Sequence, residues 1–108
     1  MGTLNYTVGA YARTKGSGAA STLSSHIRTS DAYTTSTTAG YVEDGSGDIT
    51  VSAGEIFIAT IDEAAWIRFP DADGDTVATV GDGHYMPADT ERAWEIEFPG
   101  KVSIIDVA

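Results

Sequence analysis

The sequence contains no cysteine, and this absence restricts both its means of stabilisation and its chemistry. Disulfides and thiolate metal sites need cysteine, so packing within the chain or association with other chains has to stabilise the fold. The chain has only two histidines, which without cysteine are a poor basis for a zinc site. We therefore expect no cofactor.

Basic residues are also scarce, with six Lys and Arg against sixteen Asp and Glu and a net charge of −10. Proteins bind nucleic acid largely through cations that displace counterions from phosphates, and an acidic surface repels such a ligand. Residues 1–16, MGTLNYTVGAYARTKG, hold no apolar run of the length of a signal peptide or a membrane span. We expect a soluble chain whose partners include neither nucleic acid nor a membrane.

The motifs of common catalytic sites are missing as well. The sequence has no G-x-S-x-G elbow for a serine nucleophile and no glycine-rich loop of the phosphate-binding types. Glu95 and Glu97 are two residues apart, as a pair of glycosidase carboxylates could be, but a solvated strand face explains them better because nothing there would raise a pKa. We therefore expect that the protein is not an enzyme.

Two regions of different composition divide the chain. Residues 1–42 carry three cations and one acid, for a net charge of +2, whereas residues 43–108 carry fifteen acids and three cations, for −12. Residues 21–38 contain eleven Ser and Thr in eighteen positions, with too few large apolar side chains to offset the entropy of ordering. Residues 4–10 alternate like a strand with one buried face, and residues 16–20, GSGAA, indicate a hinge. We expect an N-terminal strand and extended arm over 1–42, and a body over 43–108 that folds without residues 1–38.

The body consists of short apolar segments separated by Gly, Pro and Asp. Seven such segments cover residues 48–51, 55–61, 64–69, 76–80, 84–86, 92–98 and 101–107. No segment has a helical period, so the pattern predicts an all-β fold, an antiparallel β-sandwich or jelly-roll-like barrel. In the clearest strand, Trp94, Ile96 and Phe98 take one face and the two glutamates take the other. Its first face should be core and its second should face water.

Residues 71–82, DADGDTVATVGD, resemble a calcium loop. Oxygen ligands stand at positions 1, 3, 5 and 12 of an EF-hand-like loop, which here are Asp71, Asp73, Asp75 and Asp82. However, position 6 is Thr76 in place of glycine, position 12 is not a bidentate glutamate, and no flanking helix is expected. A β-hairpin explains the stretch better, with Gly74 in the turn and aspartates capping their own backbone. We favour the hairpin and keep the four aspartates as a weak calcium candidate.

Residues 64–69, AAWIRF, carry the clearest candidate contact residues of the body. If Ile67 and Phe69 face the core, Trp66 and Arg68 face outward, because successive side chains of a strand alternate. Tryptophan with arginine is typical of interface anchors. Arg68 lying over Trp66 within one subunit would give the same pattern. The sequence leaves both interpretations open.

The body resembles small structural proteins of tailed bacteriophages over roughly residues 48–108. The resemblance rests on SAGEIFIATIDEAAWIRF, TVATVGDGHYMPAD and AWEIEFPGKVSIIDVA, which contain a strand ending in x-R-F, an "AT" strand, a Gly-rich turn, a Pro-Ala turn and a last hairpin. Most of the shared residues are strand and turn residues. The DADGD stretch departs from the family pattern, and residues 1–42 match no family.

This resemblance implies a virion component of β-sandwich or jelly-roll type, with no catalytic residue to transfer. The expected protein is a capsid decoration (cement) protein, a homotrimer on the outer capsid surface in contact with the major capsid protein. A tail or neck component of the virion remains open. A different class, a carbohydrate- or receptor-binding module with calcium in the DADGD loop, is the alternative.

The arm would contact the capsid by lying across a neighbouring surface or by adding a strand to a sheet edge. Its positive charge would suit an acidic capsid. The expected interface residues are Tyr6, Tyr11, Arg13, Lys15, Arg28 and Tyr33 in the arm, with Trp66 and Arg68 on the body.

Overall fold

The computed structural model describes the backbone of residues 1–13 and 21–107, and the side chains of residues 1–10 and 27–107. Within these ranges the chain forms β-strands and no helix, so no helix that could span a membrane is present among them. The strands are Thr3–Arg13 (β1), Ser21–Thr34 (β2), Gly40–Tyr41 (β3), Glu43–Asp44 (β4), Gly47–Asp48 (β5), Glu55–Ile61 (β6), Ala65–Arg68 (β7), His84–Met86 (β8), Thr90–Glu95 (β9) and Ser103–Asp106 (β10). The all-β expectation is confirmed.

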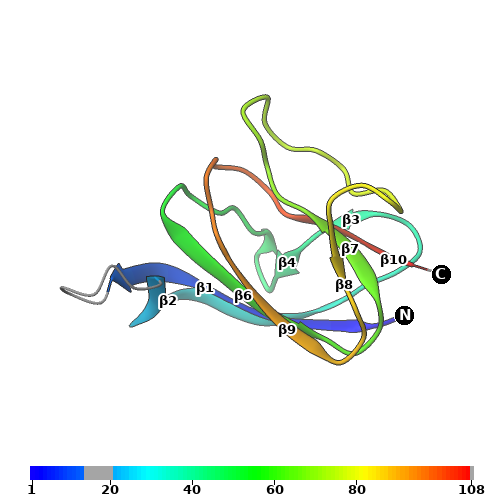
Figure 1. Cartoon of the computed structure of the whole chain (residues 1–108), viewed down its shortest axis with the longest axis horizontal. Helices are drawn as coiled ribbons and strands as arrows, with labels where there is room; N and C mark the ends of the chain where they lie inside the picture. The colour runs from blue at the N-terminus through cyan, green and yellow to red at the C-terminus, as the bar shows by residue number, and fades with distance from the viewer. Residues whose placement is uncertain (14–20, 108) are drawn as a thin grey trace.

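The strands form two four-stranded sheets, in the orders β2-β1-β6-β9 and β3-β10-β7-β8, and β4 pairs with β5 in a small hairpin. Every pairing is antiparallel. β8 and β9 follow each other in sequence but are end strands of different sheets, and Figure 1 shows them diverging from their connecting loop. The two sheets therefore do not join into a closed barrel among the described residues, and the jelly-roll-like barrel is not confirmed.

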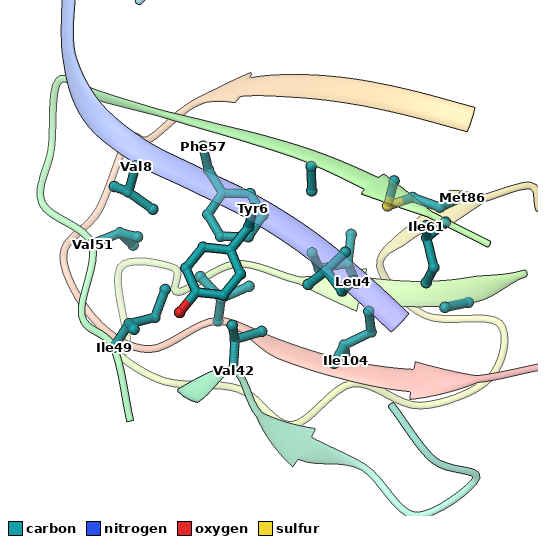
Figure 2. Close-up of a cluster of buried hydrophobic side chains, with 14 of the residues drawn as sticks. Leu4, Tyr6, Val8, Val42, Ile49, Val51, Phe57, Ile61, Met86 and Ile104 are labelled. Carbon is teal, nitrogen blue, oxygen red and sulfur yellow. The ribbon is translucent and has the colours of Figure 1, made fainter. Parts of the chain in front are cut away.

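Both sheets bury side chains in one hydrophobic core, in which Phe57 of β6 contacts three other aromatic rings. The Phe57 ring stacks on Tyr6 of β1 at 5.7 Å between centroids and contacts Phe69 edge-on at 5.4 Å. Figure 2 shows Leu4, Tyr6 and Phe57 pointing from one side toward Ile104 on the other. The buried cluster comprises Leu4, Tyr6, Val8, Val42, Ile49, Val51, Phe57, Ala59, Ile61, Ala65, Ile67, Met86, Ile96, Val102 and Ile104.

Strand alternation predicted the inner and outer faces correctly in the body. Ala65 and Ile67 of β7 are fully buried, while Trp66 and Arg68 between and after them are half-buried on the other face. In β9 and the residues after it, Ile96 is buried and Trp94 packs against the core, whereas the neighbouring glutamates are exposed. These positions obey the period of two because one face of each strand touches water.

Residues 76–80 do not form the strand that their alternation predicts. The backbone N–H of Ala78 donates to the hydroxyl of Ser103 at 2.9 Å, which fixes the segment against β10 through a side chain. The two valines of this segment, Val77 and Val80, are 50% and 56% exposed. The segment therefore covers β10 as a loop, with Ala78 as its buried residue.

The N-terminal residues also differ from the expected arm. β1 lies between β2 and β6 in the sheet, and β2 pairs with β1 over its length. Residues 21–34 are extended, as expected, but their neighbour is this chain's own β1. The extended arm is thus not confirmed, and the expected hinge at residues 16–20 lies outside the described residues.

Because β1 contributes to the core, replacing Leu4 by Ala should lower the free energy of unfolding by about 2–5 kcal/mol. Asn5→Ala, at the exposed neighbouring position, should change it by no more than about 0.5 kcal/mol. Urea denaturation followed by tryptophan fluorescence measures both. Equal stabilities of the two variants would mean that β1 is dispensable, as the sequence suggested. For the same reason we expect removal of residues 1–38 to prevent folding.

Candidate interaction surfaces

The DADGD stretch forms the predicted tight turn. Asp71 and Gly74 exchange two backbone hydrogen bonds of 3.0 Å, and the Asp71 carboxylate accepts a further one from the N–H of Asp73 at 2.8 Å. Gly74 has φ of +105°, a backbone conformation that favours glycine. The turn and its self-capping aspartate are therefore confirmed, although the strand expected after it is absent.

Three of the four aspartate carboxylates of this loop are engaged within the protein. Asp82 accepts from Arg68 at 2.5 Å, Asp71 lies 3.4 Å from the same guanidinium, and Asp75 accepts from the N–H of Lys101 at 2.7 Å. Among the described side chains, those of residues 1–10 and 27–107, no three acidic or histidine groups come together in a way that could hold a metal ion. The structure thus assigns these aspartates to loop formation and ion pairing.

Trp66 faces outward, as predicted, and lies in a row of side chains across three strands. Its strand neighbours on the two sides are Tyr85 of β8 and Ile105 of β10. The Trp66 and Tyr85 rings are 5.3 Å apart between centroids, and Tyr85 is 47% exposed. We call Trp66, Tyr85 and Ile105 the aromatic row. Arg68 does not extend this row as a free cation, because Asp71 and Asp82 hold it.

Tyr6 is a core residue, which corrects its assignment to an interface. It is 2% exposed, and its hydroxyl donates to the backbone carbonyl of Glu43 at 2.9 Å. Burial, followed by the nearby charges of Asp44 and Asp31, raises the pKa of Tyr6 to about 12. Its ring is therefore not accessible to another protein.

The other candidate arm residues have different surroundings. Tyr33 is half-buried and packs against the core, and burial raises its pKa. Tyr11 and Arg13 belong to β1, but their side chains lie outside the described ones, and Lys15 lies outside the described residues altogether.

Arg28 of β2 forms an ion pair within the chain. Its Nε donates to Glu55 Oε2 at 2.7 Å and its terminal nitrogen to Oε1 at 2.9 Å, and it also donates to the carbonyl of Thr50. Partial burial acts to raise the pKa of Glu55, but hydrogen bonds from Arg28 and from the N–H of Ser52 outweigh it, so the pKa is lowered. Arg28 thus ties the β2 edge to the start of β6.

A carboxylate is buried at one end of the core. Asp106 of β10 is 3% exposed, and neither of its oxygens has a hydrogen-bond partner among the described residues. Its Oδ2 lies 3.8 Å from the amino group of Met1, which also pairs with Glu63 at 3.0 Å. A buried carboxylate is costly unless paired, and this amino group is a cation 3.8 Å from Asp106.

A groove opens at the diverging ends of β8 and β9, with a volume of about 460 Å³. Phe69, His84 and Trp94 meet there, with ring centroids 5.0–5.8 Å apart. The sequence placed Trp94 in the core and gave His84 no role. The groove could not be predicted from the sequence, because it exists only if β8 and β9 belong to different sheets, and local periodicity does not show this.

Comparison with protein-family models, with curated proteins and with solved structures finds no match to this chain. The resemblance to phage structural proteins therefore stays a prediction.

The Arg28–Glu55 pair gives a pH-dependent prediction. Glu55→Gln should lower the free energy of unfolding by about 1 kcal/mol at neutral pH, because it removes the ion pair but keeps the side-chain size. The folded-state pKa of Glu55 is lowered, so this stabilisation is present above the unfolded-state value of 4.5 and is lost as pH falls through the folded-state pKa. Denaturation at several pH values should show the two proteins converging in acid. An exposed control, Glu91→Gln, should show a much smaller difference; a constant Glu55→Gln difference down to about pH 2 would contradict the prediction.

Proposed function

We propose that the protein is a bacteriophage virion structural protein, a capsid decoration protein that binds the major capsid protein on the outer capsid surface as a homotrimer. The aromatic row is the observation that carries this proposal. Trp66, Tyr85 and Ile105 lie side by side on the outer face of one sheet. Large aromatic side chains that face water are favoured as anchors in protein interfaces, where burial of their area supplies much of the binding energy.

The architecture supports a role in adhesion. We propose that the two sheets are the layers of an antiparallel β-sandwich, as in many small virion proteins. Among the described residues, both sheets end in strands with one unpaired edge, and β2 is the longest of these end strands at fourteen residues. Such an edge can accept a strand from a neighbouring chain. An exposed face and an open edge together offer two directions of contact, which a protein that bridges capsid subunits needs.

The interface is tested by replacing the aromatic row. Trp66→Ser combined with Tyr85→Ser should abolish the trimer or weaken binding to capsids at least about tenfold, because it removes the two anchors. Native mass spectrometry measures the oligomer, and cosedimentation with capsids of the encoding phage measures binding. Val80→Ser, which removes a similarly exposed apolar residue from the loop between β7 and β8, is the matched control and should change neither. A double variant that still forms the trimer and still binds capsids as tightly as the unchanged protein would contradict the proposal.

The location is tested by imaging particles with and without the protein. Density on the outer capsid surface that disappears in the deletion particles is the expected result. Loss of density at the tail or neck would instead assign the protein to that part of the virion.

A further inference from the structure

The groove between β8 and β9, which we call the seam groove, has an apolar wall. Phe69, His84 and Trp94 form this wall, and Phe98 lies at the same opening. Phe69 and Trp94 also contact Phe57, so their positions are fixed by the core. Aromatic rings held in this way lose little conformational entropy when a ligand covers them.

One side of the groove is the unpaired edge of β9. The N–H of Ile96 donates to the carbonyl of Glu55, and its carbonyl accepts from the N–H of Gly54. Successive peptide groups of an extended strand point to opposite sides. The N–H and carbonyl of Glu95 therefore point away from β6, where β9 has no strand neighbour among the described residues. This edge can accept one more strand.

The charge of the groove selects the ligand. Four carboxylates and one guanidinium line it, and the guanidinium of Arg68 is already paired with Asp82. Glu95 and Glu97 are exposed and form no ion pair with another described residue. An acidic ligand would be repelled here, whereas a basic one would be attracted.

We propose that the seam groove binds an extended, basic peptide segment of a partner protein, which adds to the sheet as a strand beside β9. The alternation of residues 94–98, which are the end of β9 and the three residues after it, defines the pattern of this peptide. Trp94, Ile96 and Phe98 line one face and the two glutamates the other, so apolar side chains of the peptide would meet the rings while lysines or arginines would meet Glu95 and Glu97. Main-chain hydrogen bonds supply affinity in this mode, and the alternating side chains supply specificity.

The segment from Trp94 to Phe98 sets the length of the ligand. Five extended residues span about 13–17 Å, so a pentapeptide is a sufficient probe. The proposal is independent of the aromatic row and of the virion assignment, because the groove lies at the junction of the two sheets and uses other residues.

The test uses the full chain with Trp66→Phe, which leaves Trp94 as the single tryptophan, since the sequence has two. The probe is the end-blocked peptide Val-Arg-Val-Arg-Val, and Val-Glu-Val-Glu-Val is its control. The basic peptide should change the Trp94 fluorescence in a saturable way that weakens with added salt. The acidic peptide should have no effect.

Two substitutions at Glu95 distinguish the contribution of its charge to peptide binding from that of the main-chain edge of β9. Glu95→Gln should weaken binding about three- to tenfold, because one charge contact is lost. Glu91→Gln removes the same charge from the same strand outside the groove and should change binding less than about twofold. Glu95→Pro also removes the outward N–H and should weaken binding further than Glu95→Gln, while keeping the hydrogen bonds to β6. A probe N-methylated at its two arginines, which lie opposite Glu95 and Glu97, tests the same edge if the proline variant does not fold.

Three results would overturn the proposal. They are no response of Trp94 to millimolar basic peptide, an equal response to the acidic peptide, and equal binding by the Glu95→Gln and Glu91→Gln variants. Saturable binding of a neutral oligosaccharide such as cellohexaose without a response to the peptide would also overturn it and assign the groove to a sugar.

Discussion

The fold depends on the central position of β1 in its sheet. β1 pairs with β2 on one side and β6 on the other, and it places Leu4, Tyr6 and Val8 in the core. The Tyr6 ring stacks on Phe57, while its hydroxyl is bonded to the chain at Glu43. The residues that start the chain are therefore needed to complete a core built largely from later strands. A protein of this size, with no disulfide, has little other apolar area with which to replace them.

Local periodicity predicted the faces of the strands but not their neighbours. The alternation of Leu4, Tyr6 and Val8 indicated a strand with one buried face, and all three are buried. What the alternation did not contain is the partner of that strand, because pairing between β1 and β6 joins residues about fifty positions apart. The strand predicted for residues 76–80 was wrong for a different reason. Their alternation was strand-like, but the hydroxyl of Ser103 offered their backbone a hydrogen bond outside any ladder.

For the candidate contact residues, too, the sequence predicted the direction of a side chain but not its neighbours. The outward position of Trp66 could be predicted, since it needs only the alternation of one strand. The ion pairs of Arg28 and Arg68 could not be predicted in this way. Arg28 pairs with a carboxylate distant in the sequence, and Arg68 pairs with one that a turn places beside it. In an acidic chain most cations find carboxylates of their own protein. Charge counted along the sequence therefore overstated what Arg28 contributes to the positive potential of the N-terminal residues.

The turn at residues 71–74 and the loop after it connect the two proposed binding surfaces. Arg68 follows Trp66 on the outer face of β7 and also lines the seam groove, where Asp82 and Asp71 pair with it. This pairing cancels a cation that would otherwise lie beside Glu95 and Glu97. It leaves the aromatic row without a free charge at Arg68 and leaves the groove acidic. The aspartates that resemble a calcium loop thus have an electrostatic consequence without any metal: they set the difference in charge between two neighbouring surfaces of one small protein.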